Sequence, residues 1–208
     1  MISGSKIKEI LKSIDKVLDN NKLYLSELDA KIGDGDHGLN MNKGFKAVVQ
    51  KIDTMPDNDI GNIIKGSGMA LVSNVGGASG PLYGTAFMKA SISVAGKSEV
   101  SIEDFIKMLE EALGGIKMRG KSTLGEKTMI DALEPALEQG KIALANGLSY
   151  KEILFNIQNS AYEGMIGTKN IIATKGRASY LGERSIGHQD AGATSMYLIL
   201  KIIYEEIQ

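Results

Sequence analysis

Apolar residues recur at helical spacing over most of the chain. In residues 5–20 they stand three or four positions apart, which is typical of one face of an amphipathic helix. No segment shows the sustained alternation of apolar and polar residues that a half-buried strand requires. The pattern therefore predicts an all-α fold of about eight helices. The predicted helices after the first lie at residues 23–28, 45–52, 59–74, 82–95, 101–113, 127–146, 149–166 and 191–207.

Several helix ends carry recognisable signals. Ser101 precedes two acidic residues, which is typical of a helix start with a hydroxyl at the N-cap and acids in the first turn. Ser149 with Glu152 three positions later is a capping-box pattern. Pro135 lies inside the predicted helix 127–146, where we expect it to kink the helix or to reset its start. Glycine-rich loops separate the helices, and together they suggest one end of a helical bundle shaped around a ligand.

Composition narrows the class of protein. The chain has 208 residues, of which 43% are hydrophobic, enough to bury a full core, and a net charge of −1 argues against a nucleic-acid partner. There are no cysteines, the N-terminus lacks the pattern of a signal peptide, and no apolar run approaches the ~20 residues that span a bilayer. We therefore expect a soluble, cytoplasmic protein with no membrane partner. Since no linker or change of composition interrupts the chain, we expect a single domain over residues 1–208.

One stretch fits a known phosphate-binding pattern. GGIKMRGKST at residues 114–123 contains G-x-x-x-x-G-K-S, the form in which a P-loop cradles phosphates. That geometry requires a strand to run into the loop, whereas residues 105–113 are patterned as a helix. The pattern therefore argues against a P-loop, although the stretch can still border a phosphate or a base.

The strongest chemical signal is an acidic loop, LDAKIGDGDHGLNMN, at residues 28–42. Asp29, Asp34 and Asp36 place three carboxylates within eight residues. Hard cations take oxygen ligands, and Mg²⁺ typically binds carboxylates together with substrate phosphates, so the three could hold two Mg²⁺ against one polyphosphate. The alternative is a solvated acidic turn. A calcium-binding EF-hand loop is excluded, because its twelfth position, counted from Asp34, is Phe45 rather than an acid.

Further polar groups lie in two other loops. His37 directly follows the acids and could contact a phosphate or simply pack. Arg177, in a loop at residues 176–192, could bind phosphate oxygens in bidentate fashion, or form an ordinary ion pair. Asp190 is expected as the N-cap of the last helix, a role that does not exclude ligand contact. The glycines of NVGGASGP at residues 74–81 would let the backbone approach a ligand closely.

Four of these stretches together resemble the family of DhaL subunits of bacterial dihydroxyacetone kinases. The related fatty-acid kinase domain is similar too, but typically carries Thr where His37 stands here. The resemblance runs in order over nearly the whole chain, and GRASYLGERSIGHQD is its most specific part. The stretches are DGDHGLNMNKGF (34–45), NVGGASGP (74–81), RGKSTLGEKTM (119–129) and KGRASYLGERSIGHQDAGATS (175–195).

The resemblance implies an eight-helix antiparallel barrel with a nucleotide site at one end. It implies two Mg²⁺ held by Asp29, Asp34 and Asp36, and it assigns no catalytic nucleophile or general base to this chain. Ala191 departs from the family, which often has Pro there, at the cost of some rigidity at the helix start. The nucleotide-binding residues that it implies are His37, Gly38, Leu39, Asn40, Ala78, Ser79, Gly120, Met129, Arg177, Asp190, Ala191 and Gly192.

The resemblance also implies a reaction and partners. A retained ADP is rephosphorylated by a phosphohistidine on a DhaM-type subunit, and the resulting ATP passes its γ-phosphoryl group to dihydroxyacetone held on a DhaK-type subunit. Two alternatives stay open: a free-standing subunit that exchanges ATP with solution, and a nucleotide-loaded regulator or coactivator. The presence of all three aspartates favours catalysis over regulation. A homodimer is also left open.

Overall fold

The computed structural model describes residues 1–207, and within them the chain is helical except for its loops and one two-stranded sheet. The all-α prediction is confirmed. In β1 and β2, Ile2 pairs with Val100 and Ser3 with Glu99, and strands this short leave no alternation to detect. In chain order the elements are β1 (Ile2–Ser3), α1 (Gly4–Ile32), α2 (His37–Asp53), α3 (Ile60–Asn74), α4 (Ser79–Ile92), β2 (Glu99–Val100), α5 (Ile102–Gly120), α6 (Ile130–Ala145), α7 (Tyr150–Gly167), the 3-10 helices η1 (Thr168–Asn170) and η2 (Arg177–Ser185), and α8 (Ala191–Glu206).

The chain forms two compact units. The first unit comprises Met1–Asp19 and Asn40–Lys121, and the second comprises Asn20–Leu39 and the residues from Ser122 onward. Helices α1 and α2 each contribute residues to both units, because each contains one of the boundaries. The expectation of a single domain over 1–208 stays a prediction.

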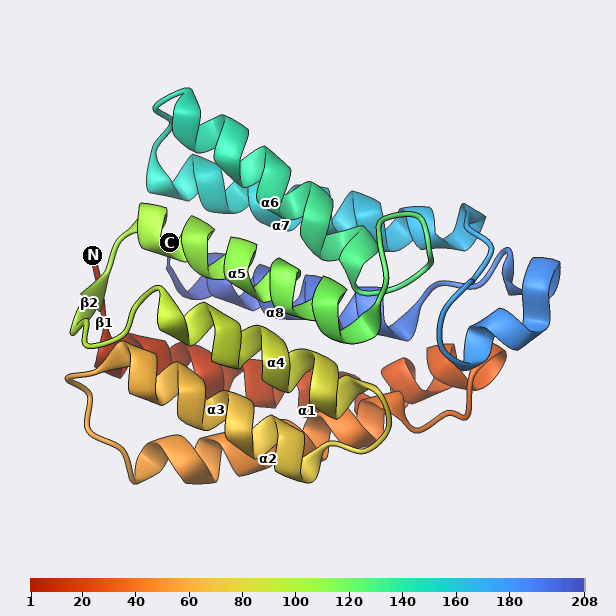
Figure 1. Ribbon diagram of the computed structural model, residues 1–208, viewed down its shortest axis with the longest axis horizontal. Helices are drawn as coiled ribbons and strands as arrows, with labels where there is room; N and C mark the ends of the chain where they lie inside the picture. The colour runs from red at the N-terminus through yellow and green to blue at the C-terminus, as the bar shows by residue number, and fades with distance from the viewer. Residues whose placement is uncertain (208) are drawn as a thin grey trace. The chain divides into compact units, whose positions relative to one another are not determined.

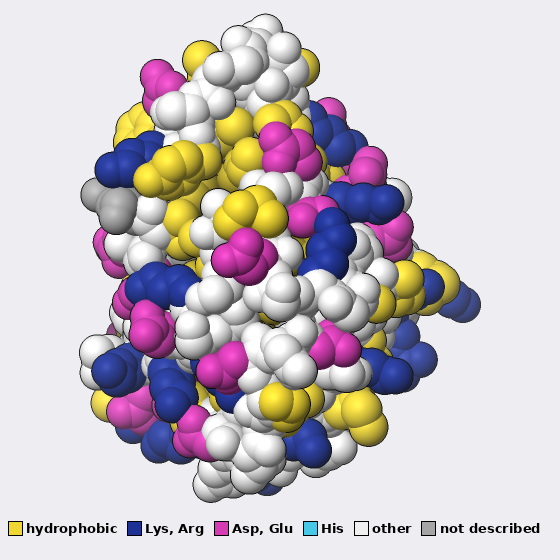
Figure 2. Space-filling model, turned by 90° about the vertical axis from the view of Figure 1, so that its left-hand side faces the viewer, with side chains coloured by type: hydrophobic (Ala, Val, Ile, Leu, Met, Phe, Trp, Pro, Cys, Tyr) yellow, Lys and Arg dark blue, Asp and Glu magenta, His cyan; other side chains and the backbone are white. Residues whose placement is uncertain are grey.

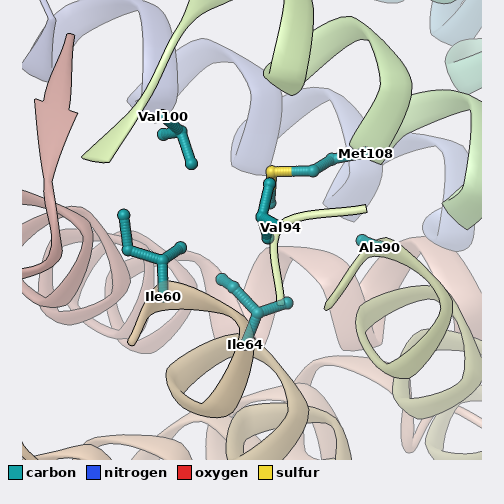
Figure 3. Packing of buried hydrophobic residues seen from close by; sticks show 6 residues of the cluster. All are labelled: Ile60, Ile64, Ala90, Val94, Val100 and Met108. Carbon is teal, nitrogen blue, oxygen red and sulfur yellow. The ribbon is translucent and has the colours of Figure 1, made fainter. Parts of the chain in front are cut away.

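In the first unit, α3 packs against α4, and α4 against α5 (Figure 1). Figure 3 shows a cluster of buried side chains that these helices share with β2: Ile60, Ile64, Ala90, Val94, Val100 and Met108. Ile60 and Ile64 lie one turn apart on α3, as an apolar face requires. Burying a side chain as large as Ile contributes about 1.5–3 kcal/mol, so a few such residues hold this layer of helices together.

In the second unit, α6, α7 and α8 pack against one another (Figure 1). A glycine permits a close approach between α6 and α7. A Cβ atom on Gly164 would lie 2.0 Å from the carbonyl oxygen of Asp131, so any other residue would force the helices apart. This contact lies at the first turn of α6, directly after the loop that precedes the helix.

Most predicted helix starts are confirmed, but α2 begins at His37, about two turns before the predicted start at residue 45. Ser101 and Ser149 both form capping boxes, the second with Glu152 as expected. Helix α4 begins at Ser79 rather than at residue 82, because Pro81 falls in its first turn, where the missing N–H is not needed. Pro135 lies inside α6 and does not reset its start. Helix α5 runs through Gly115 to Gly120, so the approach to GKST is helical, as predicted.

The break predicted between residues 5–20 and 23–28 is wrong, because α1 is continuous from Gly4 to Ile32. The polar run Asp19–Lys22 interrupts the apolar pattern only on the outer side of the helix. Leu18 and Leu25, two turns apart on the same face, are both completely buried. The apolar stripe therefore passes through the polar run.

Charged side chains of both signs are interspersed on the face shown in Figure 2, in keeping with the net charge of −1. Among the described residues, no helix combines the length and apolar character needed to cross a membrane.

The contact between α3 and α4 depends on two facing glycines. A Cβ atom on Gly68 would lie 2.8 Å from the carbonyl oxygen of Gly84, and one on Gly84 would lie 2.8 Å from that of Gly68. We expect Gly68→Ala to lower the free energy of unfolding by about 1–3 kcal/mol, because a backbone must move to admit the methyl group. Urea denaturation would measure the change.

Gly114→Ala is the matched control. Gly114 is exposed within α5, and a Cβ there meets no atom within 4 Å. This variant should gain up to about 1 kcal/mol from helix propensity. Equal stability of G68A and the wild type would contradict the close-packing argument.

Candidate functional site

Asp29, Asp34 and Asp36 form one cluster in the second unit. Each offers a carboxylate oxygen, and these oxygens all lie within 4.8 Å of one another. Asp29 lies near the end of α1, whereas the other two lie in the turn that leads to α2. Gly35 between them has a φ of 77°, a left-handed conformation that suits glycine. The sequence therefore identified three acids that the fold brings together.

Backbone amides hold this turn in place. One carboxylate oxygen of Asp29, Oδ2, accepts hydrogen bonds from the backbone N–H of Asp36 at 3.0 Å and of His37 at 3.3 Å. These are amides at the start of α2, where helices lack internal acceptors. Asp29 thus fastens the first residues of α2 to the last turns of α1, and it keeps the three carboxylates close despite their repulsion.

The cluster suits a hard divalent cation. All its donors are carboxylate oxygens, and Asp34 and Asp36 are exposed, which leaves room for the waters that Mg²⁺ usually keeps. Arg177 supplies one positively charged side chain, since its Nη2 lies 2.9 Å from Asp34 Oδ2. Both side chains of this pair are exposed, so the pair itself contributes little to stability, about 0–1 kcal/mol. Arg177 is therefore an ion-pair partner here, in reach of anything that the carboxylates bind.

An open pocket of 380 Å³ borders the ion pair. It lies between the end of α1 and η2, and Tyr180 at its rim is 87% exposed. The lining residues are Ala30, Lys31, Ile32, Gly33, Arg177, Tyr180 and Leu181.

His37 is buried, and it connects the start of α2 to α8. Its Nε2 lies 2.9 Å from Ser195 Oγ, whose hydroxyl in turn donates to the carbonyl oxygen of Gly192 at 3.0 Å. Burial lowers the pKa of His37, against the opposing effect of Asp29 and Asp36, so the ring is neutral at neutral pH. A neutral ring with this partner positions the start of α8 and is poorly suited to charge pairing with a phosphate.

Asp190 is the N-cap of α8, as predicted. Its Oδ2 accepts a hydrogen bond from the N–H of Ala193 at 2.7 Å, and its own N–H donates to Thr168 Oγ1 at 3.1 Å. Burial raises the pKa of this carboxyl group to about 7, against the lowering effect of the Ala193 hydrogen bond. Asp131 raises it further. The group therefore changes charge near neutrality.

The remaining candidates are divided between the units. Met129 and Gly38 lie in the second unit with Leu39, Arg177 and Asp190–Gly192, whereas Ala78, Ser79 and Gly120 lie in the first. Asn40 also belongs to the first unit, and its Oδ1 would lie 3.0 Å from a Cβ on Gly76, in the loop that leads to α4. The suggestion that these loops together surround one ligand stays a prediction.

Sequence reasoning missed two buried charged residues. Asp131 is 3% exposed and accepts hydrogen bonds from the N–H groups of Gly125 at 2.6 Å and Thr128 at 2.7 Å. Its position in the first turn of a predicted helix was the only available signal. Lys127 is 2% exposed, and nothing in its sequence context distinguishes it from a surface lysine.

The chain matches the DAK2 domain family over residues 31–205. It is 41% identical to the "PEP-dependent dihydroxyacetone kinase, ADP-binding subunit DhaL" of Escherichia coli (strain K12), over 97% of this chain and 96% of that protein. It is 38% identical to the "PTS-dependent dihydroxyacetone kinase, ADP-binding subunit DhaL" of Lactococcus lactis, over 96% of this chain and 95% of that protein.

Solved structures share the fold. The native dihydroxyacetone kinase of C. freundii superposes with a TM-score of 0.74 at 23% identity, over 99% of this chain and 35% of that chain. The same kinase in complex with AMP-PNP and Mg²⁺ gives a TM-score of 0.72 at 24% identity, over 95% of this chain and 33% of that chain.

The pKa of Asp190 predicts a pH dependence of stability. Between its ordinary value of 3.8 and about 7, the folded protein keeps a proton that the unfolded chain has released. This contribution to stability is complete below the lower value and is lost as the pH rises through the upper one. The free energy of unfolding should therefore fall over this range by a few kcal/mol, at about 1.4 kcal/mol per unit.

Asp190→Asn isolates this effect, because Asn keeps an N-cap acceptor but does not titrate. Urea unfolding of both proteins across this pH range should show a shallower decline for the variant. Other groups, including His37, titrate equally in both proteins and cancel. Parallel curves for the two proteins would contradict the raised pKa.

Proposed function

This chain belongs to the DAK2 domain family, and from that premise we propose that it is the ADP-binding subunit of a dihydroxyacetone kinase. The observation that carries the proposal is the cluster of three carboxylates within 4.8 Å, with Arg177 paired to one of them. Relatives of nearly the same length that bear this description support it, as does the shared fold of a kinase solved with AMP-PNP and Mg²⁺.

Asp29, Asp34 and Asp36 are proposed to hold two Mg²⁺. When bound, Mg²⁺ supplies positive charge that offsets the negative charge of the phosphates during transfer. The chain's own part is to orient: Asp29 is fixed by the amides of Asp36 and His37, so its free oxygen has a defined direction. Arg177, released from Asp34, would bind phosphate oxygens with its planar fork of donors.

The nucleotide is proposed to contact the helix starts that the candidate residues occupy. These are His37–Asn40 at the start of α2, Ala78 and Ser79 at the start of α4, and Asp190–Gly192 at the start of α8. Helix N-termini carry unsatisfied N–H groups and a partial positive charge, which favour phosphates. Gly120 and Met129, at the end of α5 and before α6, complete the proposed set.

The proposed reaction needs no nucleophile on this chain. Bound ADP would receive a phosphoryl group from a phosphohistidine of a DhaM-type protein, and the ATP so formed would pass its γ-phosphoryl group to dihydroxyacetone on a DhaK-type subunit. Phosphoryl transfer depends on positioning and charge neutralisation more than on covalent chemistry by the protein. The carboxylates and Arg177 are groups of this kind.

Retention of the nucleotide is the first point to test. The protein should be purified without added nucleotide and denatured, and the released nucleotide quantified by chromatography. ADP near one per chain is expected if the nucleotide is a retained cofactor. A protein free of nucleotide that is active with added ATP and a DhaK partner would instead be an ATP-exchanging subunit.

Asp34→Asn tests the metal assignment. This variant should lose phosphoryl transfer by roughly 10²-fold or more, because charge stabilisation is the main catalytic contribution. Asp53→Asn is the matched control, since Asp53 is another exposed acid in an ion pair, 2.7 Å from Lys12 Nζ. Full activity of D34N with unchanged bound nucleotide would show that the metal assignment is wrong.

A further inference from the structure

Lys127 is a buried lysine whose ammonium group is fully used within the second unit. Its Nζ donates to the carbonyl oxygens of Thr168 at 2.6 Å, Ile171 at 3.3 Å and His188. An ammonium group has three N–H donors, and here each has a backbone acceptor. The side chain therefore serves as a junction for backbone segments that are distant in the sequence.

The backbone conformation of Lys127 is one that residues other than glycine rarely adopt. Lys127 has a φ of 62°, in the left-handed region where a residue with a Cβ is strained by about 1–2 kcal/mol. Glycine would adopt the same conformation without strain, but it has no ammonium group to offer. The strain is offset by the three hydrogen bonds, which a glycine or an apolar residue would leave unmade.

The three acceptors belong to segments that lead to proposed nucleotide contacts. Thr168 and Ile171 bound the η1 turn after α7, and His188 stands just before Asp190. A second connection runs in parallel, because Thr168 Oγ1 accepts from the N–H of Asp190 and donates to the carbonyl oxygen of Met165 at 2.6 Å. Movement at Lys127 would therefore be passed on to the start of α8.

The charges around the ammonium group are consistent with this geometry. Burial lowers the pKa of Lys127, whereas Asp190 and Asp131 raise it. Asp131 itself holds the loop before α6, through the N–H groups of Gly125 and Thr128. The lysine thus lies between two acids that each fix the start of a helix, α6 for Asp131 and α8 for Asp190.

We propose that Lys127 is a positioning residue for nucleotide binding, which holds Met129 at the start of α6 and Asp190–Gly192 at the start of α8 in one fixed arrangement. The residue acts through the carbonyl groups of Thr168, Ile171 and His188 and does not itself contact the nucleotide. This inference rests on the proposed function, since Met129 and Asp190–Gly192 are the contacts that it positions.

Lys127→Met tests the proposal, because Met keeps an apolar stem of similar length and removes only the donors. After retained nucleotide has been removed from both proteins, calorimetric titration with ADP and Mg²⁺ should show a dissociation constant raised roughly tenfold or more in the variant, as for other groups that orient a binding site. Hydrogen–deuterium exchange without nucleotide should become faster in residues 124–131, 168–173 and 186–192, but not in α3 and α4. Lys151→Met, an exposed lysine of α7, is the control and should match the wild type.

Each other outcome overturns the proposal. Unchanged ADP affinity in K127M would show that the ammonium group of Lys127 does not contribute to ADP binding. Faster exchange throughout the protein would show a general structural role. If K127M does not fold, Lys127→Gln replaces it, because Gln keeps two N–H donors on a shorter stem and so weakens the same three contacts. Wild-type affinity there would equally overturn the proposal. A wild-type protein that binds no ADP would instead overturn the proposed function, and this inference with it.

Discussion

The site depends on one carboxylate oxygen, Asp29 Oδ2, which accepts the N–H groups of both Asp36 and His37. Three acids this close repel one another, and a flexible turn would relieve the repulsion by opening. The two hydrogen bonds prevent this, since opening the turn would leave the first amides of α2 without acceptors. The negative charge is therefore concentrated by backbone geometry, and the proposed cations would meet carboxylates that are already close together.

Around this point, the ionisable groups fall into an exposed and a buried set with different tasks. Asp34, Asp36 and Arg177 are open to solvent and can exchange partners at small cost. His37 and Lys127 are buried and each is fixed by hydrogen bonds, with pKa values that burial lowers. The exposed set has the freedom that ligand binding needs, whereas the buried set provides the rigid support on which precise positioning depends.

Local signals in the sequence were enough for most of the helices and for the acidic cluster, but not for the continuity of α1, the start of α2 or the buried residue Lys127. The capping box of Ser149 and the acids at 29, 34 and 36 act over a few residues, so their consequences can be seen in the sequence itself. Lys127 binds carbonyl groups 41, 44 and 61 residues away, and a backbone acceptor leaves no side-chain pattern to find. The continuity of α1 was missed for a related reason, because the apolar stripe passes beneath a polar run.

The continuity of α1 also bears on the order in which the protein can fold during synthesis. Its first residues belong with 40–121, and its last residues belong with the segment from 122 onward. The acidic turn is thus made early, yet most of the unit that contains it is made last. After the three aspartates have been synthesised, more than 80 residues of the first unit, 40–121, must follow before α6, α7 and α8 are made. Contacts of such sequence separation slow folding, so the acidic turn stays on the nascent chain for a long interval before the rest of the second unit is available to pack with it.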